Sequence, residues 1–194
     1  ATGGFLDDSG YDRIYWMHSK RWPGFNMAQH SPKAGQLIVF DDATTYAVKY
    51  FYRRHEWSPK FIPAGQGYLL FADDNDNEPE FIERGKKTLD WLPKGASTDR
   101  YRRGGRGTDK GTGFIRRNPE KWQTLIPLRI RAMVLAGDRI FAAGTPDVLD
   151  PKDPLAAFEG RAGASLQVFS TKDGSKIGSY PMKSEPAFDG MSAA

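Results

Sequence analysis

The acidic loop at residues 73–79 has the residue types that bind calcium. Oxygen-bearing side chains alternate along it at Asp73, Asn75 and Asn77, and Ca²⁺ prefers such hard oxygen ligands. An EF-hand loop would need a glycine where Glu78 stands, so the loop is not an EF-hand. An ordinary solvated turn is one interpretation. The alternative is a looser calcium site made by three carboxylates: Asp73, Asp74 and Asp76.

The histidines and the glycine-rich stretch carry weaker signals. His18, His30 and His55 each stand alone, without the i, i+4 spacing of a zinc-binding helix, which favours surface or hydrogen-bonded histidines. Residues 104–113 are rich in glycine but follow no predicted strand. Their spacing fits neither the P-loop nor the dinucleotide-binding fingerprint. We interpret this stretch as a loop that is disordered or ordered by a partner.

Positive charge is concentrated in residues 84–117, which hold eleven basic and three acidic residues, although the whole chain carries only +4. Arginines interleaved with glycines and an aromatic ring can bind phosphates and stack on bases. Binding of nucleic acid or another polyanion is therefore one alternative function. Docking on an acidic protein surface or an anionic polysaccharide is the interpretation we favour. The candidate contacts are Arg100, Arg102, Arg103, Arg106 and Lys110.

Aromatic side chains are dense in residues 1–34, where they most often pack a core or a seam between sheets. An exposed aromatic platform for a glycan is the alternative, with Trp16, Trp22 and Tyr101 as the surface candidates. Catalysis has little support, because the sequence lacks a Gly-x-Ser-x-Gly motif. We therefore favour a chain without catalytic residues.

Short strands and tight turns are the elements that would position these side chains. Gly137-Asp138 and Asp173-Gly174 supply the positive φ angles of hairpin turns. They separate four predicted strands: 128–136, 139–144, 165–171 and 175–182. A second set of four is predicted earlier in the chain: 35–40, 45–51, 61–62 and 67–72. A single four-stranded antiparallel sheet cannot bury both of its faces, so we expect stacked sheets.

The length of 194 residues suits one domain, and no apolar run approaches the ~20 residues of a membrane helix. The sequence has no cysteine, which excludes disulfides and thiolate metal sites. We expect a single all-β domain over residues 1–194, with a long polar and basic insertion at 72–127 and a second insertion at 145–163. Residues 186–194 are expected to form one more strand.

The stretch 131–182 resembles a blade of the PQQ-binding-like β-propeller repeat, of the quinoprotein-dehydrogenase-like family. The resemblance is carried by 136–144 and by 166–180, which reads as a strand, a polar turn ending in glycine, and a strand closing on an aromatic. In that family the closing aromatic, usually tryptophan, docks between blades, and Tyr180 stands in its place. Residues 4–42 are also similar to large exported proteins of planctomycete-type bacteria.

The resemblance implies a partial β-propeller in a periplasmic or secreted protein. A whole ring needs more blades than 194 residues supply at roughly 40–50 per blade, so the chain is expected to be a piece of a larger protein. Most members of this repeat class are scaffolds. The expected role is thus a non-catalytic structural or interaction module, in contact with a protein partner, further blades or a glycan. The alternative is a propeller component of a redox or carbohydrate-active assembly. No cofactor is expected, with calcium at the loop carboxylates as the alternative.

Overall fold

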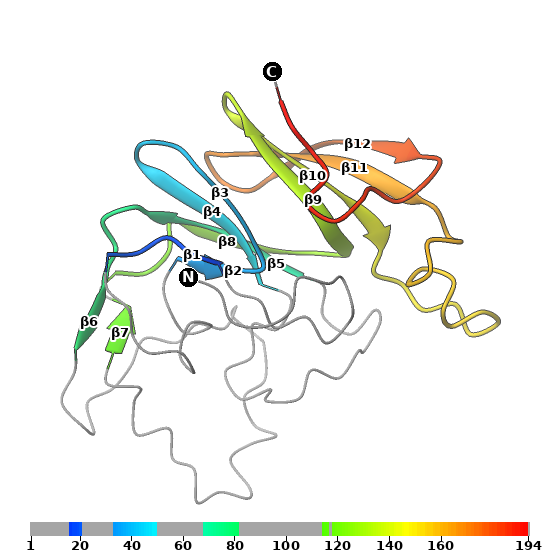
Figure 1. The fold of residues 1–194 in the computed structure, drawn as a ribbon, viewed down its shortest axis with the longest axis horizontal. Helices are drawn as coiled ribbons and strands as arrows, with labels where there is room; N and C mark the ends of the chain where they lie inside the picture. The colour runs from blue at the N-terminus through cyan, green and yellow to red at the C-terminus, as the bar shows by residue number, and fades with distance from the viewer. Residues whose placement is uncertain (1–15, 21–32, 50–67, 82–113, 117, 194) are drawn as a thin grey trace, which may run out of the picture.

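The computed structural model describes residues 16–20, 33–49, 68–81, 114–116 and 118–193. These ranges contain twelve β-strands and no helix, so the prediction of an all-β chain is confirmed (Figure 1). Accordingly, no described segment has the long apolar helix that crosses a membrane. The strands are β1 (Trp16–Met17), β2 (Ala34–Gly35), β3 (Leu37–Phe40), β4 (Thr44–Lys49), β5 (Tyr68–Asp74), β6 (Pro79–Phe81), β7 (Phe114–Arg116), β8 (Trp122–Ile126), β9 (Leu128–Ala136), β10 (Arg139–Pro146), β11 (Ala164–Ser170) and β12 (Lys176–Met182).

Two four-stranded antiparallel sheets form the body of the described structure. We call β3-β4-β5-β8 the first sheet and β9-β10-β11-β12 the second sheet; the pairs β1-β2 and β6-β7 are separate ribbons. The first sheet takes its fourth strand from Trp122–Ile126, which pairs with β5. The strand predicted at residues 61–62 lies outside the described residues. The excursion predicted for 72–127 therefore returns to the sheet at Trp122.

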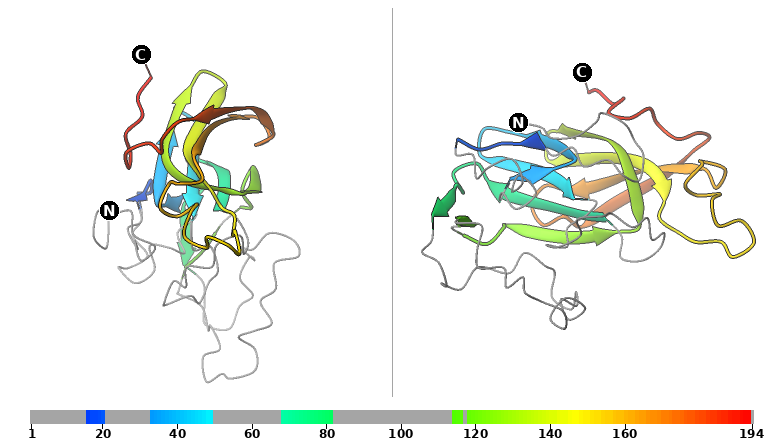
Figure 2. Two further views of the ribbon diagram at one scale, coloured as in Figure 1. Left: turned by 90° about the vertical axis from the view of Figure 1, so that its right-hand side faces the viewer. Right: turned by 60° about the horizontal axis from the view of Figure 1, so that its bottom comes forward.

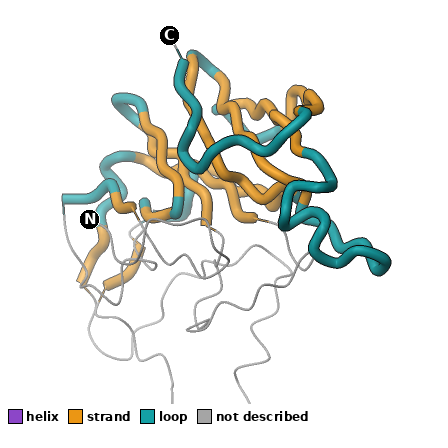
Figure 3. Tube along the Cα trace, turned by 45° about the vertical axis from the view of Figure 1, so that its right-hand side comes forward, coloured by secondary structure: helices purple, strands orange, loops and turns teal. Residues whose placement is uncertain are grey.

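The turns of the second sheet have the predicted geometry, whereas the segment after its last strand differs from expectation. Gly137 and Gly174 both take positive φ, at 58° and 70°. Residues 147–163, between β10 and β11, form a chain of turns (Figure 3). The strand expected at 186–194 is wrong for its described part, because Asp189 takes a positive φ of 53° that interrupts an extended chain. Asp189 N instead donates one hydrogen bond to Arg131 O of β9 (2.8 Å).

The two sheets stack with the same strand order and the same strand direction. Their first strands, β3 and β9, lie in contact (Figure 2). The fourth strand β8 reaches the turn between β11 and β12 through the Trp122 side chain. Only Pro127 separates β8 from β9, so the chain reverses there. Since β8 is antiparallel to β3, β9 runs parallel to β3. The two sheets therefore meet through unlike faces, and no twofold axis relates them.

One hydrophobic core fills the space between the sheets. We call the two faces that meet there the seam faces. Antiparallel register puts Leu37, Tyr46 and Leu70 on the seam face of the first sheet, and Ile140 on that of the second. Strand alternation explains this, because residues two apart point to the same face. The buried members of this core are Leu37, Tyr46, Val48, Leu70, Ala72, Ile126, Leu128, Ile130, Met133, Ile140, Ala142 and Phe169.

Trp122 closes the seam at the end where the hairpin turns lie. Its indole Nε1 donates to Thr171 O in the β11–β12 turn (2.8 Å), and its ring lies 6.1 Å from the Tyr46 ring. Thr171 N in turn donates to Asp138 O (3.0 Å), which ties the two turns of the second sheet together. Gly174 leaves room for the indole, because a Cβ there would lie 2.5 Å from a ring carbon of Trp122.

Substitution at Gly174 should show how much this contact contributes. Gly174→Ala and the control Gly137→Ala both put a side chain on a positive-φ residue, which costs about 1 kcal/mol. Only Gly174→Ala also meets Trp122, which adds about 1–3 kcal/mol of overpacking. The free energy of unfolding, measured in urea, should therefore fall further for Gly174→Ala than for Gly137→Ala. In a Trp122→Ala background the extra loss should disappear, and equal losses in both backgrounds would contradict the assignment.

Candidate functional site

A polar cluster ties the β1-β2 ribbon to the first sheet, and we call its six members the cap cluster. They are His18, Ser19, Lys33, Thr45, Asn75 and Glu78. At its centre the fully buried Lys33 Nζ donates to Glu78 Oε1 at 3.0 Å and to the carbonyl oxygen of Asn75. The other carboxylate oxygen of Glu78 accepts from Ser19 Oγ at 2.6 Å and from the Lys20 amide at 3.0 Å. One carboxylate thus holds both strands of the ribbon.

His18 links the same ribbon to β4. Its Nδ1 lies 2.7 Å from Thr45 Oγ1, and Thr45 Oγ1 donates to Asn75 Oδ1 at 2.7 Å. Because Thr45 has one hydroxyl hydrogen, this pattern assigns the proton of the His18–Thr45 bond to Nδ1 of the imidazole. The ring also stacks on Phe40, with 4.5 Å between centroids. The expectation of a hydrogen-bonded histidine is confirmed for His18, while His30 and His55 lie outside the described residues.

Electrostatics hold the cap cluster in one protonation state at neutral pH. Burial and then the positive charge of Lys33 lower the pKa of His18, against a smaller opposing effect of Glu78. Burial alone would raise the pKa of Glu78, but the hydrogen bonds from Ser19, Lys33 and the Lys20 amide, with the charge of Lys33, bring it down to about 2. The cluster therefore contains a neutral imidazole and an ionised Lys33–Glu78 pair.

The cap cluster suits a structural role better than a catalytic one. A carboxylate with a pKa of about 2 is a poor general base at neutral pH, because base strength falls with pKa. The Lys33 ammonium is fully buried and paired, so it does not act as a nucleophile. Ser19 donates its hydroxyl proton to Glu78 and has no imidazole beside it in the described hydrogen bonds. We interpret the cap cluster as a structural clamp.

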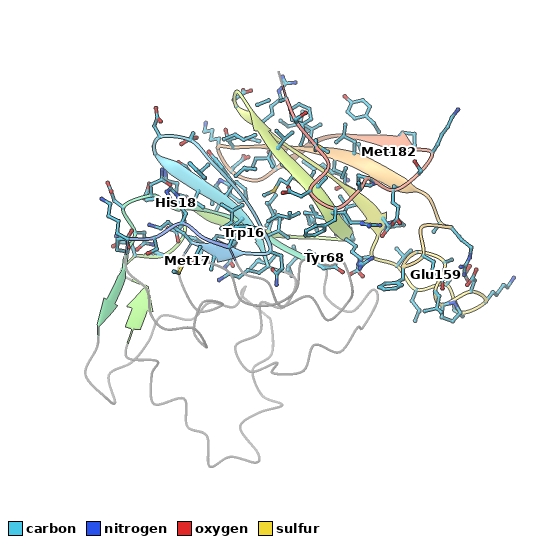
Figure 4. The ribbon with its side chains drawn as sticks, viewed as in Figure 1. Trp16, Met17, His18, Tyr68, Glu159 and Met182 are labelled. Carbon is cyan, nitrogen blue, oxygen red and sulfur yellow. The ribbon has the colours of Figure 1, made fainter. Side chains whose placement is uncertain are left out.

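A second polar cluster lies at the opposite end of the first sheet, where β8 passes to β9; Figure 4 labels Tyr68 there and His18 at the ribbon. Arg129 is 6% exposed, and its guanidinium carbon lies 4.4 Å from the centre of the Phe158 ring. Burial raises the pKa of Tyr68, with Arg129 lowering it and Asp147 raising it. The cluster connects both sheets with the turns at 147–163.

The proposed calcium ligands do not gather around one point. Asp73 is 1% exposed, and its Oδ1 accepts from Asn77 Nδ2 (2.7 Å). Asp74 Oδ1 instead pairs with Lys121 Nζ (2.7 Å), and Asp76 is exposed. In the ranges that the structure describes, no three acidic or histidine side chains come close enough to hold a metal ion.

The other predicted site residues are described only in part. Trp16 pairs with Gly35 in the β1-β2 ribbon and is 42% exposed. Trp22 and Tyr101 lie outside the described residues, as does the whole basic set of Arg100, Arg102, Arg103, Arg106 and Lys110. Tyr180, which the family resemblance assigns to docking between blades, is 58% exposed. The docked aromatic is Trp122.

Sequence reasoning missed the cap cluster because its members come from separate segments. Lys33 and Glu78 are 45 residues apart, and Ser19 and Glu78 are 59 apart. No spacing rule connects residues at such distances. The signal nearest to it in the sequence was the polar pair His18-Ser19, directly after the apolar residues Trp16 and Met17.

Comparisons with protein-family models, with curated proteins and with solved structures find no match to this chain.

Removing the Glu78 charge should destabilise the fold more than removing an exposed charge. Glu78→Gln leaves the buried Lys33 ammonium without its carboxylate, and we expect a loss of about 2–4 kcal/mol. The control Asp153→Asn breaks the half-exposed pair with Arg161 and should cost less than about 1 kcal/mol. Chemical denaturation measures the free energy of unfolding of both variants. Similar small losses would show that the Lys33–Glu78 pair is not a clamp.

Acid should weaken the cap cluster in two stages. The folded pKa of His18 lies below the ordinary 6.5, so neutral His18 stabilises the fold above that pH and the contribution is lost on acidification below it. The folded pKa of Glu78 is about 2 against an ordinary 4.5, so its contribution is lost between pH 4.5 and 2. Unfolding free energies measured against pH should show both stages. His18→Gln should flatten the first and Glu78→Gln the second, and unchanged profiles would refute the assignment.

Proposed function

We propose that this chain is a non-catalytic structural and interaction module built from propeller-type blades. The observation that carries the proposal is the stacking of two four-stranded meanders with the same order and direction around one core. Blades of a propeller are four-stranded sheets repeated around an axis. The contact of the first strands β3 and β9, with the one-residue link from the last strand of one sheet to the first of the next, supports this interpretation.

The clusters of charged residues also support a scaffold. The Lys33–Glu78 pair and the Arg129 guanidinium are each enclosed at an end of the first sheet, where they join segments distant in sequence. Groups used in this way make a fold specific and rigid. A rigid stack suits a module that presents surfaces to other proteins, in an exported bacterial protein as the family resemblance implies.

The proposal predicts that both sheets unfold as one unit. Urea unfolding followed by hydrogen exchange should show the amides of β4 and β10 losing protection at the same denaturant concentration, because both sheets share one core. Trp122→Ala removes the indole from the seam and should bring separate transitions, whereas Leu125→Ala, at a side chain 41% exposed on the same strand, should not. Separate transitions in the unmodified chain would contradict a rigid scaffold.

A binding measurement distinguishes the scaffold proposal from the enzymatic alternative, a component of a redox assembly. Equilibrium dialysis of the chain against pyrroloquinoline quinone and calcium should leave no stoichiometric quinone absorbance with the protein. Retention of one quinone per chain would replace the scaffold proposal with a redox function.

A further inference from the structure

A loop projects from one end of the second sheet and carries exposed apolar side chains. We call residues 148–163, between β10 and β11, the projecting loop (Figure 1). Its side chains Val148, Leu149 and Leu155 are 45%, 49% and 50% exposed. Single exposed apolar residues are common on protein surfaces, but groups of them mark interaction sites. The projecting loop is therefore a candidate surface for binding another molecule.

Polar and aromatic contacts restrain the conformation of the projecting loop. Arg161 donates to both carboxylate oxygens of Asp153, from Nη2 at 2.6 Å and from Nε at 3.2 Å, and it also pairs with Glu159. The Phe158 ring attaches the loop to the second sheet, because its centre lies 4.4 Å from the guanidinium carbon of Arg129 on β9. A loop that is ordered before binding loses less conformational entropy when a partner covers it.

The edge strand β12 is a second exposed surface, and it is basic. Among the described strands only β11 pairs with it. Its side chains Ile177 and Tyr180 are 54% and 58% exposed. Residues 172–183 carry three lysines and one aspartate, a net charge of +2. Lys176 and Lys183 are exposed and form no ion pair with any residue that the structure describes. The strand therefore offers a partner both apolar contacts and positive charge.

The projecting loop carries the opposite charge. It has three carboxylates and two basic side chains, a net charge of −1. Arg161 is shared by Asp153 and Glu159, so it neutralises only one of these two carboxylates. Asp150 is exposed as well. Surfaces of opposite charge attract each other and fix the register of a complex. The loop and β12 are thus complementary in charge, and both present apolar side chains.

The loop and the strand are neighbours on the molecule. Ala164, which directly follows the loop, is opposite Met182 at the end of β12, and Figure 4 labels Met182 and Glu159 at this end of the sheet. A twofold axis brings the same patch of two copies together, so each contact between unlike parts of the patch forms twice. We propose that the chain forms a symmetric dimer in which the projecting loop of each copy packs on β12 of the other, with loop carboxylates facing Lys176 and Lys183.

A second copy suits this patch better than a membrane does. Anionic lipid headgroups attract basic segments, and they repel the carboxylates of the projecting loop. An unrelated protein would need both signs of charge in the matching order, whereas a second copy supplies them by symmetry. The dimer goes beyond the proposed function, because it does not require the two sheets to be blades. Its test reads the loop and β12, and the unfolding test reads the seam.

Sedimentation equilibrium of the full chain tests the dimer, for which we expect a Kd of about 1–100 μM, as in weak interfaces. The loop variant combines Asp150→Asn and Glu159→Lys; it makes the loop basic and keeps an acceptor for the Lys152 amide. The strand variant combines Lys176→Glu and Lys183→Glu and makes β12 acidic. Each variant should self-associate at least about tenfold more weakly, because like charges then face each other. The matched control Asp42→Lys reverses an exposed charge on the first sheet and should leave the Kd unchanged.

An equimolar mixture of the loop variant and the strand variant is the decisive measurement. The basic loop then faces the acidic strand, and the acidic loop faces the basic strand, so a heterodimer should form with about the affinity of the unmodified chain. One chain with all four substitutions should dimerise with itself for the same reason. Far-ultraviolet circular dichroism checks that each variant is folded.

Three results would overturn the dimer proposal. The first is an unmodified chain that stays monomeric at about 500 μM, well above the expected Kd. Flotation of such a monomer with phosphatidylglycerol vesicles would assign the loop to a membrane instead. The second is unchanged self-association of both variants, which would place the interface elsewhere. The third is a mixture of folded variants that remains monomeric, since the loop and β12 would then not be partners.

Discussion

Burial of two apolar sheet faces against each other is the interaction on which the described structure depends. The apolar face of a sheet must be buried against another layer, and here each sheet supplies the cover for the other. Trp122 sets how the layers align, because its indole spans from the fourth strand of one sheet to a turn of the other. The Lys33–Glu78 pair and Arg129 lie at opposite ends of the first sheet, where they tie down the ribbon and the turns at 147–163.

The parts of the fold that sequence reasoning predicted are those determined by neighbours in the chain. The turn at Gly137 and the turn at Gly174 follow from local conformational freedom, and the second sheet is contiguous in sequence, so its four strands were found. The fourth strand of the first sheet was not, because β8 joins β5 only after residues 75–121. Pairing across such a separation depends on which partner edge is free, and local patterns do not show this.

For the candidate sites too, sequence reasoning predicted what neighbouring residues determine and missed what distant segments bring together. A histidine bonded to a hydroxyl was foreseen for His18, but its placement beside Lys33 and Glu78 required three segments to converge. Asp73 had the alternation of a cation-binding loop, yet β5 buries its side chain, and its Oδ1 accepts a hydrogen bond from Asn77. Tyr180 and Trp122 are both aromatics on the fourth strand of a sheet, but only Trp122 contacts the other sheet among the described residues, and a local pattern does not show which of two such rings is covered.

The single residue between the sheets, Pro127, has a consequence for the order in which the molecule assembles. Strands β9 to β12 form through short loops apart from the turns at 147–163, so their closure costs little chain entropy, whereas β8 must return over a long excursion to reach β5. We infer that the second sheet forms first. Pro127, the single residue that links β8 to β9, then keeps β8 close to β5, the strand with which it pairs. Folding kinetics of Ala142→Gly and Ala47→Gly would reveal this, since φ values should be high in β10 and low in β4; the reverse pattern would reverse the order.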